Sequence, residues 1–279
     1  MKIRKNAYAK VNLGLRVLSK RSDGFHPLKT VFHLIDLHDV IEMEINDSDV
    51  LSVSVTGNED YLPTGAKDLM EKAAELFAAS TDKIFSIIIK IEKHIPSQAG
   101  LGGGSSDAST VLCTLNEYFG YPLSKERLME LSLMLGSDVP FFTSGYPAAY
   151  GEGRGEILSE VSSCNYPCII VKKKGDKVST KEAFRILDER SEIIDEKPMW
   201  PLPLNTWRGT LINDFDIMQD IRNEDEFKKL SSLSSYDSTT GSGACQILVF
   251  ENDEKADEVM NQSTSYELIR TRLLSLQRP

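Results

Sequence analysis

The stretch Pro-Ser-Gln-Ala-Gly-Leu-Gly-Gly-Gly-Ser-Ser-Asp occupies residues 96–107, shortly after a run of β-branched residues. Its glycines at positions 100, 102, 103 and 104 allow the backbone to approach a ligand closely, and the N–H groups can converge on an anion. Ser105, Ser106 and Asp107 stand where a helix is expected to begin, so the positive end of that helix would face the same anion. The stretch therefore predicts a phosphate-binding loop, and a glycine-rich turn without a ligand is the alternative.

The spacing of these residues excludes other common nucleotide-binding motifs. A Walker loop requires Gly-Lys followed by Ser or Thr, and no lysine follows these glycines. A dinucleotide fingerprint requires glycine at position 105, which is serine here. The His-Arg-Asp and Asp-Phe-Gly signatures of protein kinases are absent from the sequence.

Apolar periodicity on both sides of the loop predicts a mixed α+β chain. Strands are expected over residues 8–17, 30–37, 40–45, 51–55 and 85–92, and helices over 68–79, 108–119 and 125–135. Further along, the pattern predicts a hairpin at 151–155, a strand over 168–172, a helix from the capping box at 179–182 to about residue 190, a strand over 245–250 and a final helix. The pattern is interrupted near Ser163 and Pro167, so we expect an N-terminal domain over residues 1–163 and a C-terminal domain over 164–279.

Composition and charge argue against several classes of function. The 279 residues include 32 basic and 42 acidic side chains, and the net charge of −10 argues against a non-specific nucleic-acid binder. Four cysteines without a Cys-x-x-Cys pair indicate reduced, structural thiols rather than a zinc site. The first residues lack the apolar region of a secretory signal, and no apolar run approaches the ~20 residues of a membrane helix. We therefore expect a cytoplasmic monomer or homodimer without membrane or nucleic-acid partners.

Several further motifs, taken together with the glycine loop, resemble those of the GHMP kinases. They are Ala9-Lys-Val-Asn-Leu13, Arg21-Ser-Asp-Gly-Phe-His26, Gly136-Ser-Asp-Val-Pro-Phe141, Asn213-Asp214 and Thr240-Gly-Ser-Gly-Ala244, in the family's order along the chain. Within that superfamily, the triple glycine makes the chain most like the 4-diphosphocytidyl-2-C-methyl-D-erythritol kinases. The resemblance runs from about residue 7 to residue 250. It implies an α+β, two-lobed GHMP kinase fold with the active site in the cleft between the lobes.

The resemblance implies an ATP-dependent kinase that phosphorylates a hydroxyl of 4-(cytidine 5'-diphospho)-2-C-methyl-D-erythritol, in the non-mevalonate route to isoprenoid precursors. ATP is the implied cofactor, and Mg²⁺ would arrive with the nucleotide rather than occupy a dedicated metal site. The residues implied to bind ATP are Lys93, Pro96, Ser97, Gln98, Ala99, Gly100, Leu101, Gly102, Gly103, Gly104, Ser105 and Ser106. For Lys93, a solvated lysine is the alternative.

Asp138 and Lys10 are the candidate catalytic pair. Asp138 would accept the proton of the attacking hydroxyl, and the N–H groups of a short helix starting there would keep its carboxylate ionised. Because a lysine within an apolar strand must be exposed or paired, we expect Lys10 to form an ion pair with Asp138. The alternatives are a helix-capping aspartate and a solvent-facing lysine.

The turn Asp23-Gly-Phe-His26 is implied to hold the cytidine end of the substrate. Phe25 would stack on the base and His26 would hydrogen-bond the pyrimidine edge. The family usually has tyrosine in place of Phe25, so the ring is retained and one polar contact is lost; a core position is the alternative for Phe25. The full set of implied substrate-binding residues is Asn12, Phe25, His26, Asp138, Thr180, Gly241 and Ser242. The capping box alone also accounts for Ser179 and Thr180.

Two other functions remain open from the sequence. Another GHMP kinase, acting on mevalonate, homoserine or a sugar, would have no cytosine to stack on the Asp-Gly-Phe-His turn. A catalytically silent ATP-binding sensor would be free to lose Lys10 or Asp138, whereas both residues are present.

Overall fold

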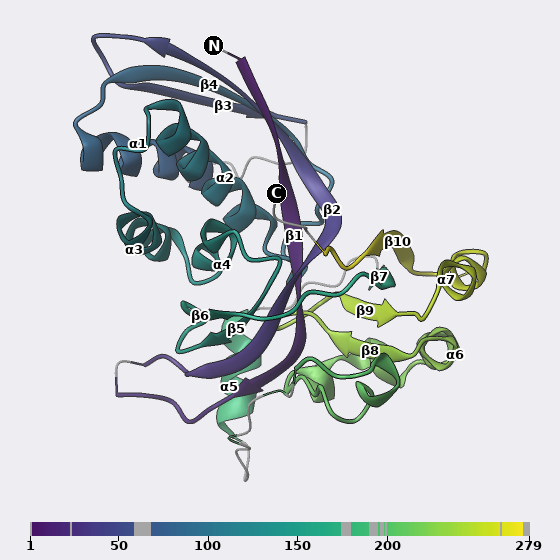
Figure 1. Ribbon diagram of the computed structural model, residues 1–279. Helices are drawn as coiled ribbons and strands as arrows, with labels where there is room; N and C mark the ends of the chain where they lie inside the picture. Colours follow the sequence, from purple (N-terminus) through teal and green to yellow (C-terminus); the bar gives the residue numbers. More distant parts are fainter. Residues whose placement is uncertain are drawn as a thin grey trace. The chain divides into compact units, whose positions relative to one another are not determined.

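The computed structural model describes residues 2–22, 24–58, 68–173, 180–189, 195, 198, 200–262 and 264–275 (Figure 1). The chain forms two compact units that interleave along the sequence. The first unit comprises Met1–Ala9, Leu37–Ser97 and Gly102–Gly145, and the second comprises Lys10–Asp36, Gln98–Leu101 and Tyr146–Pro279. Two long strands, β1 (Lys2–Val17) and β2 (Leu28–Asp47), contribute residues to both units. These units are each built from several segments of the chain, whereas the predicted domains are two continuous ranges, 1–163 and 164–279. The boundary between residues 163 and 164 stays a prediction.

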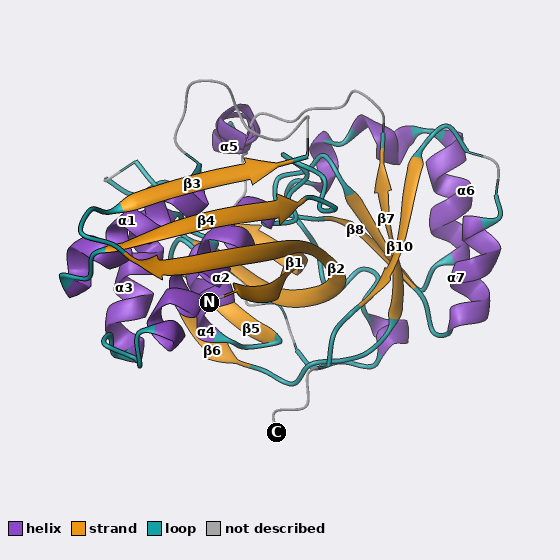
Figure 2. Ribbon diagram, turned by 90° about the horizontal axis from the view of Figure 1, so that it is seen from above, coloured by secondary structure: helices purple, strands orange, loops and turns teal. Residues whose placement is uncertain are grey.

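The first unit is built on a sheet with one apolar face. The second half of β2 pairs antiparallel with β4 (Phe85–Glu92), and β3 (Ser52–Gly57) pairs in parallel with β4. Side chains along β4 alternate, with Phe85, Ile87, Ile89 and Ile91 buried, as a period of two requires. The helices α1 (Leu69–Thr81), α2 (Gly103–Tyr118) and α3 (Lys125–Leu135) contribute to the same core, and α4 (Val139–Ser144) follows them. Figures 1 and 2 show α1 and α2 on one side of these strands.

The second unit contains a hairpin and a separate antiparallel sheet. The first half of β2 pairs with β5 (Ala148–Glu152), which forms a hairpin with β6 (Ile157–Glu160). The other sheet has the strand order β10 (Glu267–Arg272), β7 (Pro167–Lys172), β9 (Gln246–Val249) and β8 (Tyr236–Thr239). Two helices, α6 (Asp225–Leu233) and α7 (Asp253–Met260), share an apolar core with this sheet and lie on the same side of it (Figure 2).

Four shorter elements of the second unit lie outside these sheets. They are the helix α5 (Thr180–Asp188) and the 3-10 helices η1 (Leu204–Thr206), η2 (Asp216–Met218) and η3 (Asp220–Asn223). A single residue, Gln219, separates η2 from η3.

The α+β class is confirmed, and most predicted elements are present. The strands expected over 30–37 and 40–45 are one strand, β2. The helix expected from residue 108 begins earlier, at Gly103, inside the glycine run. The final helix is α7, but β10 follows it. This strand was not predicted from the sequence, nor were α6 and β8 in and around the serine-rich stretch. Within the described part of the chain, no helix is long and apolar enough to cross a membrane.

Candidate active site

The glycine loop ends directly in α2. Gly102 has φ +70° and occupies the N-cap of that helix, and the N–H of Ser106 donates to its carbonyl at 2.9 Å. The N–H groups before Ser106 in the first turn have no carbonyl partner within the helix, which makes them available to an anion. Three of the predicted ATP-binding residues, Ala99, Leu101 and Ser106, are buried.

Lys93 lies in a buried ion-pair cluster beside the start of α2. Its Nζ is 2.7 Å from Asp107 Oδ2 and also pairs with Asp39, whose other carboxylate oxygen accepts from the backbone N–H of His94 and Ile95 at 2.6 and 2.9 Å. A Cβ on Gly103 would lie 3.4 Å from Lys93 Nζ and 3.0 Å from Ile95 Cγ2. The cluster therefore holds the segment before the loop against the first turn of α2, and a solvated Lys93 is ruled out by its burial.

The charges of this cluster hold one another in place. Burial raises the pKa of Asp107, with the Lys93 ammonium opposing the shift. Burial also disfavours the charged form of Lys93, but the neighbouring carboxylates outweigh it and raise the pKa of the ammonium. Oδ1 of Asp107 is buried without a hydrogen-bond partner.

Lys10 is buried in the second unit and is tied to Asn12. Its Nζ donates to Asn12 Oδ1 at 2.7 Å and lies 5.4 Å from the centroid of the Phe32 ring. Its backbone N–H donates to the carbonyl of Leu101 at 3.0 Å, which joins β1 to the glycine loop. The solvent-facing alternative for Lys10 is therefore wrong.

Asn12 connects Lys10 to the turn at 240–244. Its Oδ1 also accepts from the backbone N–H of Gly241 at 3.0 Å, and its Nδ2 donates to Thr30 Oγ1 at 2.9 Å. The hydroxyl of Thr240 donates to the carbonyl of Gly100 at 3.1 Å. Two segments that the sequence separates by 140 residues thus meet at one point of the second unit.

Asp138 occupies the N-cap position of α4 and is half-buried. The N–H of Val139 donates to the carbonyl of Gly136 at 3.2 Å, and the Asp138 side chain makes no capping hydrogen bond. A purely capping aspartate therefore does not account for this residue. Asp138 belongs to the first unit and Lys10 to the second, and their ion pair stays a prediction.

His26 and Phe25 adopt different environments at the predicted cytidine turn. Phe25 is exposed, and the Arg154 guanidinium lies 4.1 Å from its ring centroid, so the core alternative for Phe25 is wrong. His26 is largely buried, with Nδ1 3.0 Å from the Leu18 carbonyl and Nε2 3.1 Å from Asp188 Oδ1 of α5. Asp23, Ser179 and the Thr180 side chain lie outside the described residues, although Thr180 begins α5.

Comparison with known proteins identifies the family. The model of the GHMP kinases N terminal domain matches residues 68–146. A 4-diphosphocytidyl-2-C-methyl-D-erythritol kinase of Clostridium beijerinckii is 39% identical over 188 residues, which cover 67% of this chain and 65% of the relative. Another, of Syntrophomonas wolfei, is 36% identical over 230 residues, covering 82% and 77%. The chain belongs to the 4-diphosphocytidyl-2-C-methyl-D-erythritol kinase family.

Solved structures agree with this family. A crystal structure of a 4-(cytidine 5'-diphospho)-2C-methyl-D-erythritol kinase matches with a TM-score of 0.78 and 28% identity, over 97% of this chain and 99% of that one. The mevalonate kinase of Methanococcus jannaschii matches with a TM-score of 0.68 at 14% identity, which shows a shared fold. Kinase activity is common to the names of these relatives and of the matched domain.

Two groups of side chains in this kinase were not predicted from the sequence. Phe184 of α5 lies with its ring centroid 5.2 Å from that of His26, next to the predicted cytidine turn. The amphipathic pattern after the capping box predicts the helix that carries Phe184. An apolar residue in such a pattern is expected in the core, so the pattern does not mark Phe184 as part of a site. The second group comprises polar residues at every third position from Asn213 to Arg222, in the segment that contains η2 and η3.

Proposed function

We propose that this kinase transfers the γ-phosphoryl group of ATP to a hydroxyl of 4-(cytidine 5'-diphospho)-2-C-methyl-D-erythritol, in the non-mevalonate route to isoprenoid precursors. The relatives that cover most of the chain carry this substrate in their names. The observation that carries the proposal is the buried Lys10, whose ammonium is held by Asn12 and whose backbone N–H binds the Leu101 carbonyl of the glycine loop. A silent sensor has no need of a buried cation at that place.

The glycine loop binds the ATP phosphates through backbone N–H groups. Gly102 to Gly104 leave the first turn of α2 open to close approach, and the helix dipole favours negative charge there. Lys93 supports this loop from its ion pairs with Asp107 and Asp39, and so acts on ATP through the position of the loop. Phosphoryl transfer depends mainly on such positioning and charge stabilisation.

The acceptor chemistry is assigned to Asp138 and Lys10. Asp138 accepts the proton of the substrate hydroxyl, the hydroxyl oxygen forms a bond to the γ-phosphorus, and the bond from that phosphorus to the β–γ bridging oxygen breaks to release ADP. The Lys10 ammonium favours the ionised forms of Asp138 and of the attacking oxygen. The ion pair of Asp138 with Lys10 is part of this proposal.

Mg²⁺ is expected to accompany ATP. Among the described residues, no group of three or more His, Cys, Asp or Glu is placed to hold a metal ion. Mg²⁺ keeps several waters and binds through phosphates with one or two protein oxygens. The hydroxyl of Ser105, in the first turn of α2, is the candidate protein oxygen. When bound, the ion neutralises charge that develops on the β- and γ-phosphates.

The cytidine end is assigned to the turn that carries Phe25 and His26. Phe25 is exposed and is the ring assigned to stack on the base, in exchange for its contact with the Arg154 guanidinium. The ring of Phe184 packs between His26 and Phe215, so it supports the turn from the core side. To bind the pyrimidine edge, His26 must exchange its contact with Asp188 for one with the base.

An ADP-release assay with a small acceptor panel tests the proposed function. The panel contains the cytidine substrate, mevalonate and homoserine, each with ATP and Mg²⁺. We expect ADP release that depends on the cytidine substrate. Release with only mevalonate or homoserine would overturn the substrate assignment, and release with none of the three would favour an ATP-binding sensor.

A further inference from the structure

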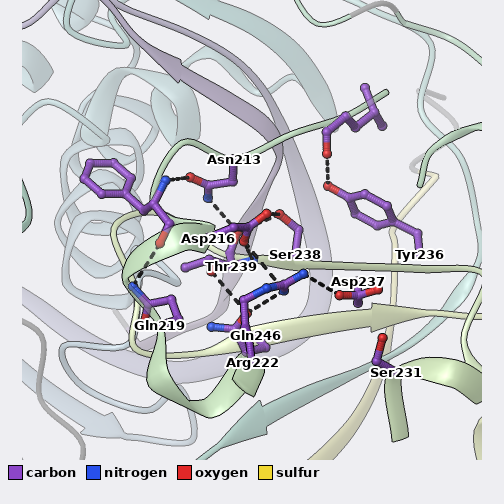
Figure 3. Close-up of polar contacts among 12 residues, drawn as sticks. Asn213, Asp216, Gln219, Arg222, Ser231, Tyr236, Asp237, Ser238, Thr239 and Gln246 are labelled. Carbon is purple, nitrogen blue, oxygen red and sulfur yellow. Dashed lines mark hydrogen bonds and ion pairs between the residues drawn. The ribbon is translucent and has the colours of Figure 1, made fainter. Parts of the chain in front are cut away.

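A row of four polar side chains follows the segment that contains η2 and η3. Asn213, Asp216, Gln219 and Arg222 recur at every third position; Asn213 precedes η2, Asp216 begins η2, Gln219 lies between the two helices with extended backbone, and Arg222 lies in η3. Figure 3 shows all four directed toward the hairpin of β8 and β9, which continues into the turn at 240–244. We call these four residues the polar row.

Each member of the polar row binds a different point of the hairpin. Asn213 Nδ2 donates to the carbonyls of Thr239 and Gly241 at 2.7 and 3.0 Å, and Asp216 Oδ1 accepts from the Thr239 N–H at 2.7 Å. Gln219 Nε2 donates to the carbonyl of Ser242 at 3.3 Å. Arg222 binds Gln246 Oε1 at 2.9 Å and Asp237 Oδ2 at 2.5 Å, so both strands and the turn are held (Figure 3).

The polar nature of this contact indicates more than core packing. Asn213 and Gln219 are buried, at 1% and 5% exposure, and a buried amide is costly unless its hydrogen bonds are made. Apolar side chains fill the core between this sheet and helices α6 and α7. Hydrogen bonds from the polar row to backbone atoms have defined directions, so they hold the turn at 240–244 in one position.

The turn transmits its position to the proposed catalytic lysine. Thr240 donates to the Gly100 carbonyl, and the Gly241 N–H donates to Asn12 Oδ1, the same atom that accepts from Lys10 Nζ. A shift of the turn therefore changes the hydrogen bonds of Asn12 and, through it, the position of the Lys10 ammonium. All of these contacts lie within the second unit.

Gln219 is the member of the row whose contact is with the tip of the turn. A Cβ on Gly243 would lie 2.7 Å from Gln219 Oε1 and 2.9 Å from its Nε2, so the amide packs directly on the turn backbone. Its other hydrogen bond, 3.4 Å to the Phe215 carbonyl, stays within its own segment. We propose that Gln219 is a positioning residue for phosphoryl transfer, which holds the 240–244 turn so that Asn12 keeps Lys10 in place. The proposal rests on the catalytic part assigned to Lys10.

The test compares Gln219→Met with Tyr236→Phe. The methionine keeps the volume of Gln219 and removes its donor. Tyr236 lies on β8 in the same hairpin, and its buried hydroxyl donates to the Leu211 carbonyl at 2.8 Å, away from the turn. Gln219→Met loses two long hydrogen bonds, to the Phe215 and Ser242 carbonyls, and Tyr236→Phe loses one short bond, to the Leu211 carbonyl. Both variants therefore lose buried hydrogen bonding from the same part of the second unit. Only Gln219→Met releases the turn.

The first measurement is steady-state kinetics at a temperature where both variants are folded. We expect kcat of Gln219→Met to fall on the order of tenfold to a hundredfold, as for a small displacement of a catalytic group, with KM for ATP changed by less than about twofold. Tyr236→Phe should keep the wild-type kcat. A wild-type kcat in folded Gln219→Met, or an equal loss in both variants, would overturn the proposal.

Hydrogen exchange provides a readout that does not depend on turnover. The Gly241 amide should exchange at least ~10-fold faster in Gln219→Met than in wild type or in Tyr236→Phe, because its bond to Asn12 opens more often. Unchanged exchange in Gln219→Met would contradict the proposal whatever the kinetics. If wild type does not phosphorylate the cytidine substrate, the substrate assignment fails on that result alone, and the variants are compared on whichever acceptor the wild type uses.

Discussion

Gly100 and Thr240 approach so closely that a Cβ built on Gly100 would lie 2.0 Å from the carbonyl oxygen of Thr240. Gly100 belongs to the glycine loop and Thr240 to the glycine-rich turn at 240–244. Gly100 has φ +75°, in the left-handed region of backbone conformation that favours glycine. The first glycine loop thus begins in contact with the second glycine turn, and no side chain fits between them. This contact couples the proposed phosphate site to the turn that holds Asn12.

Replacing Gly100 with alanine should therefore separate the two turns. The methyl group would meet backbone atoms that cannot rotate away, so the loop or the turn must move. We expect kcat/KM for ATP to fall on the order of a hundredfold, measured by steady-state ADP release.

Gly120→Ala is the matched control for this change. Gly120 has nearly the same backbone angle, φ +76°, but no atom lies within 4 Å of an added Cβ. Both alanines carry the ~1 kcal/mol strain of a left-handed backbone, so any further loss of thermal stability in Gly100→Ala measures the contact with Thr240. Equal kinetics for the two variants would show that the contact between Gly100 and Thr240 has no part in catalysis.

Asp138→Asn should lower kcat by about 10²–10⁴-fold, because an amide cannot accept the proton of the attacking hydroxyl. The affinity for ATP, measured by calorimetry, should stay within about threefold of wild type if the residue acts on the acceptor alone.

Asp68→Asn provides the comparison, since Asp68 is the N-cap of α1 and its side chain accepts from the Met70 N–H at 2.7 Å. Asparagine caps a helix about as well as aspartate, so this variant should keep full turnover. A near-normal kcat in Asp138→Asn would remove Asp138 as the base.

The local sequence signals located much of the fold and the candidate loops. Alternation along residues 85–92 indicated β4, and the glycine run indicated a phosphate-binding turn. The start of α2 was missed because glycine has a low helix propensity, while the structure uses Gly103 for close approach to Lys93 and Ile95. Tertiary packing therefore determines where α2 begins, against the local helix propensity of glycine.

The environments of the charged residues were not predictable in the same way. For Lys93, a solvated lysine stayed open beside the implied ATP contact because its carboxylate partner Asp39 is 54 residues away in the sequence. The burial of Lys10 likewise depends on Asn12 and Phe32, neither of which marks it as buried by local pattern. Contacts between distant segments decide whether a polar side chain is paired, and one sequence does not contain that information in its spacing.

Protonation of His33 should destabilise the protein in mild acid. Its Nε2 accepts from the Cys164 N–H at 3.1 Å while its Nδ1 donates to the Leu34 carbonyl at 2.8 Å, so a second ring proton would face a donor. Burial lowers the pKa of His33 from 6.5 to about 4. Between these values the unfolded chain binds more protons than the folded one, so stability is complete above pH 6.5 and falls as the pH drops toward 4.

Urea unfolding at several pH values measures this loss, which the pKa difference places at about 3 kcal/mol. His33→Gln retains an acceptor for the Cys164 N–H and does not titrate, so its stability should change less over the same interval. His94→Gln, at an exposed histidine, should keep the wild-type slope. A wild-type slope in His33→Gln would assign the acid sensitivity to other groups.

Lys93→Met should destabilise the first unit by about 3–5 kcal/mol, because it leaves Asp39 and Asp107 buried without their cation. Denaturant unfolding measures the loss. Lys5→Met removes an ion pair with Glu117 in which both side chains are largely exposed, so it should cost less than about 1 kcal/mol.

The double variant Lys93→Met with Asp107→Asn separates charge from packing. Asp39 still accepts from the N–H groups of His94 and Ile95, whereas Asp107 has no other hydrogen-bond partner to keep it ionised. Removing the Asp107 charge should therefore restore part of the stability lost with Lys93, and the two changes should be non-additive. Simple addition of the two losses would mean that Lys93 stabilises the loop through its aliphatic stem rather than through its ion pairs.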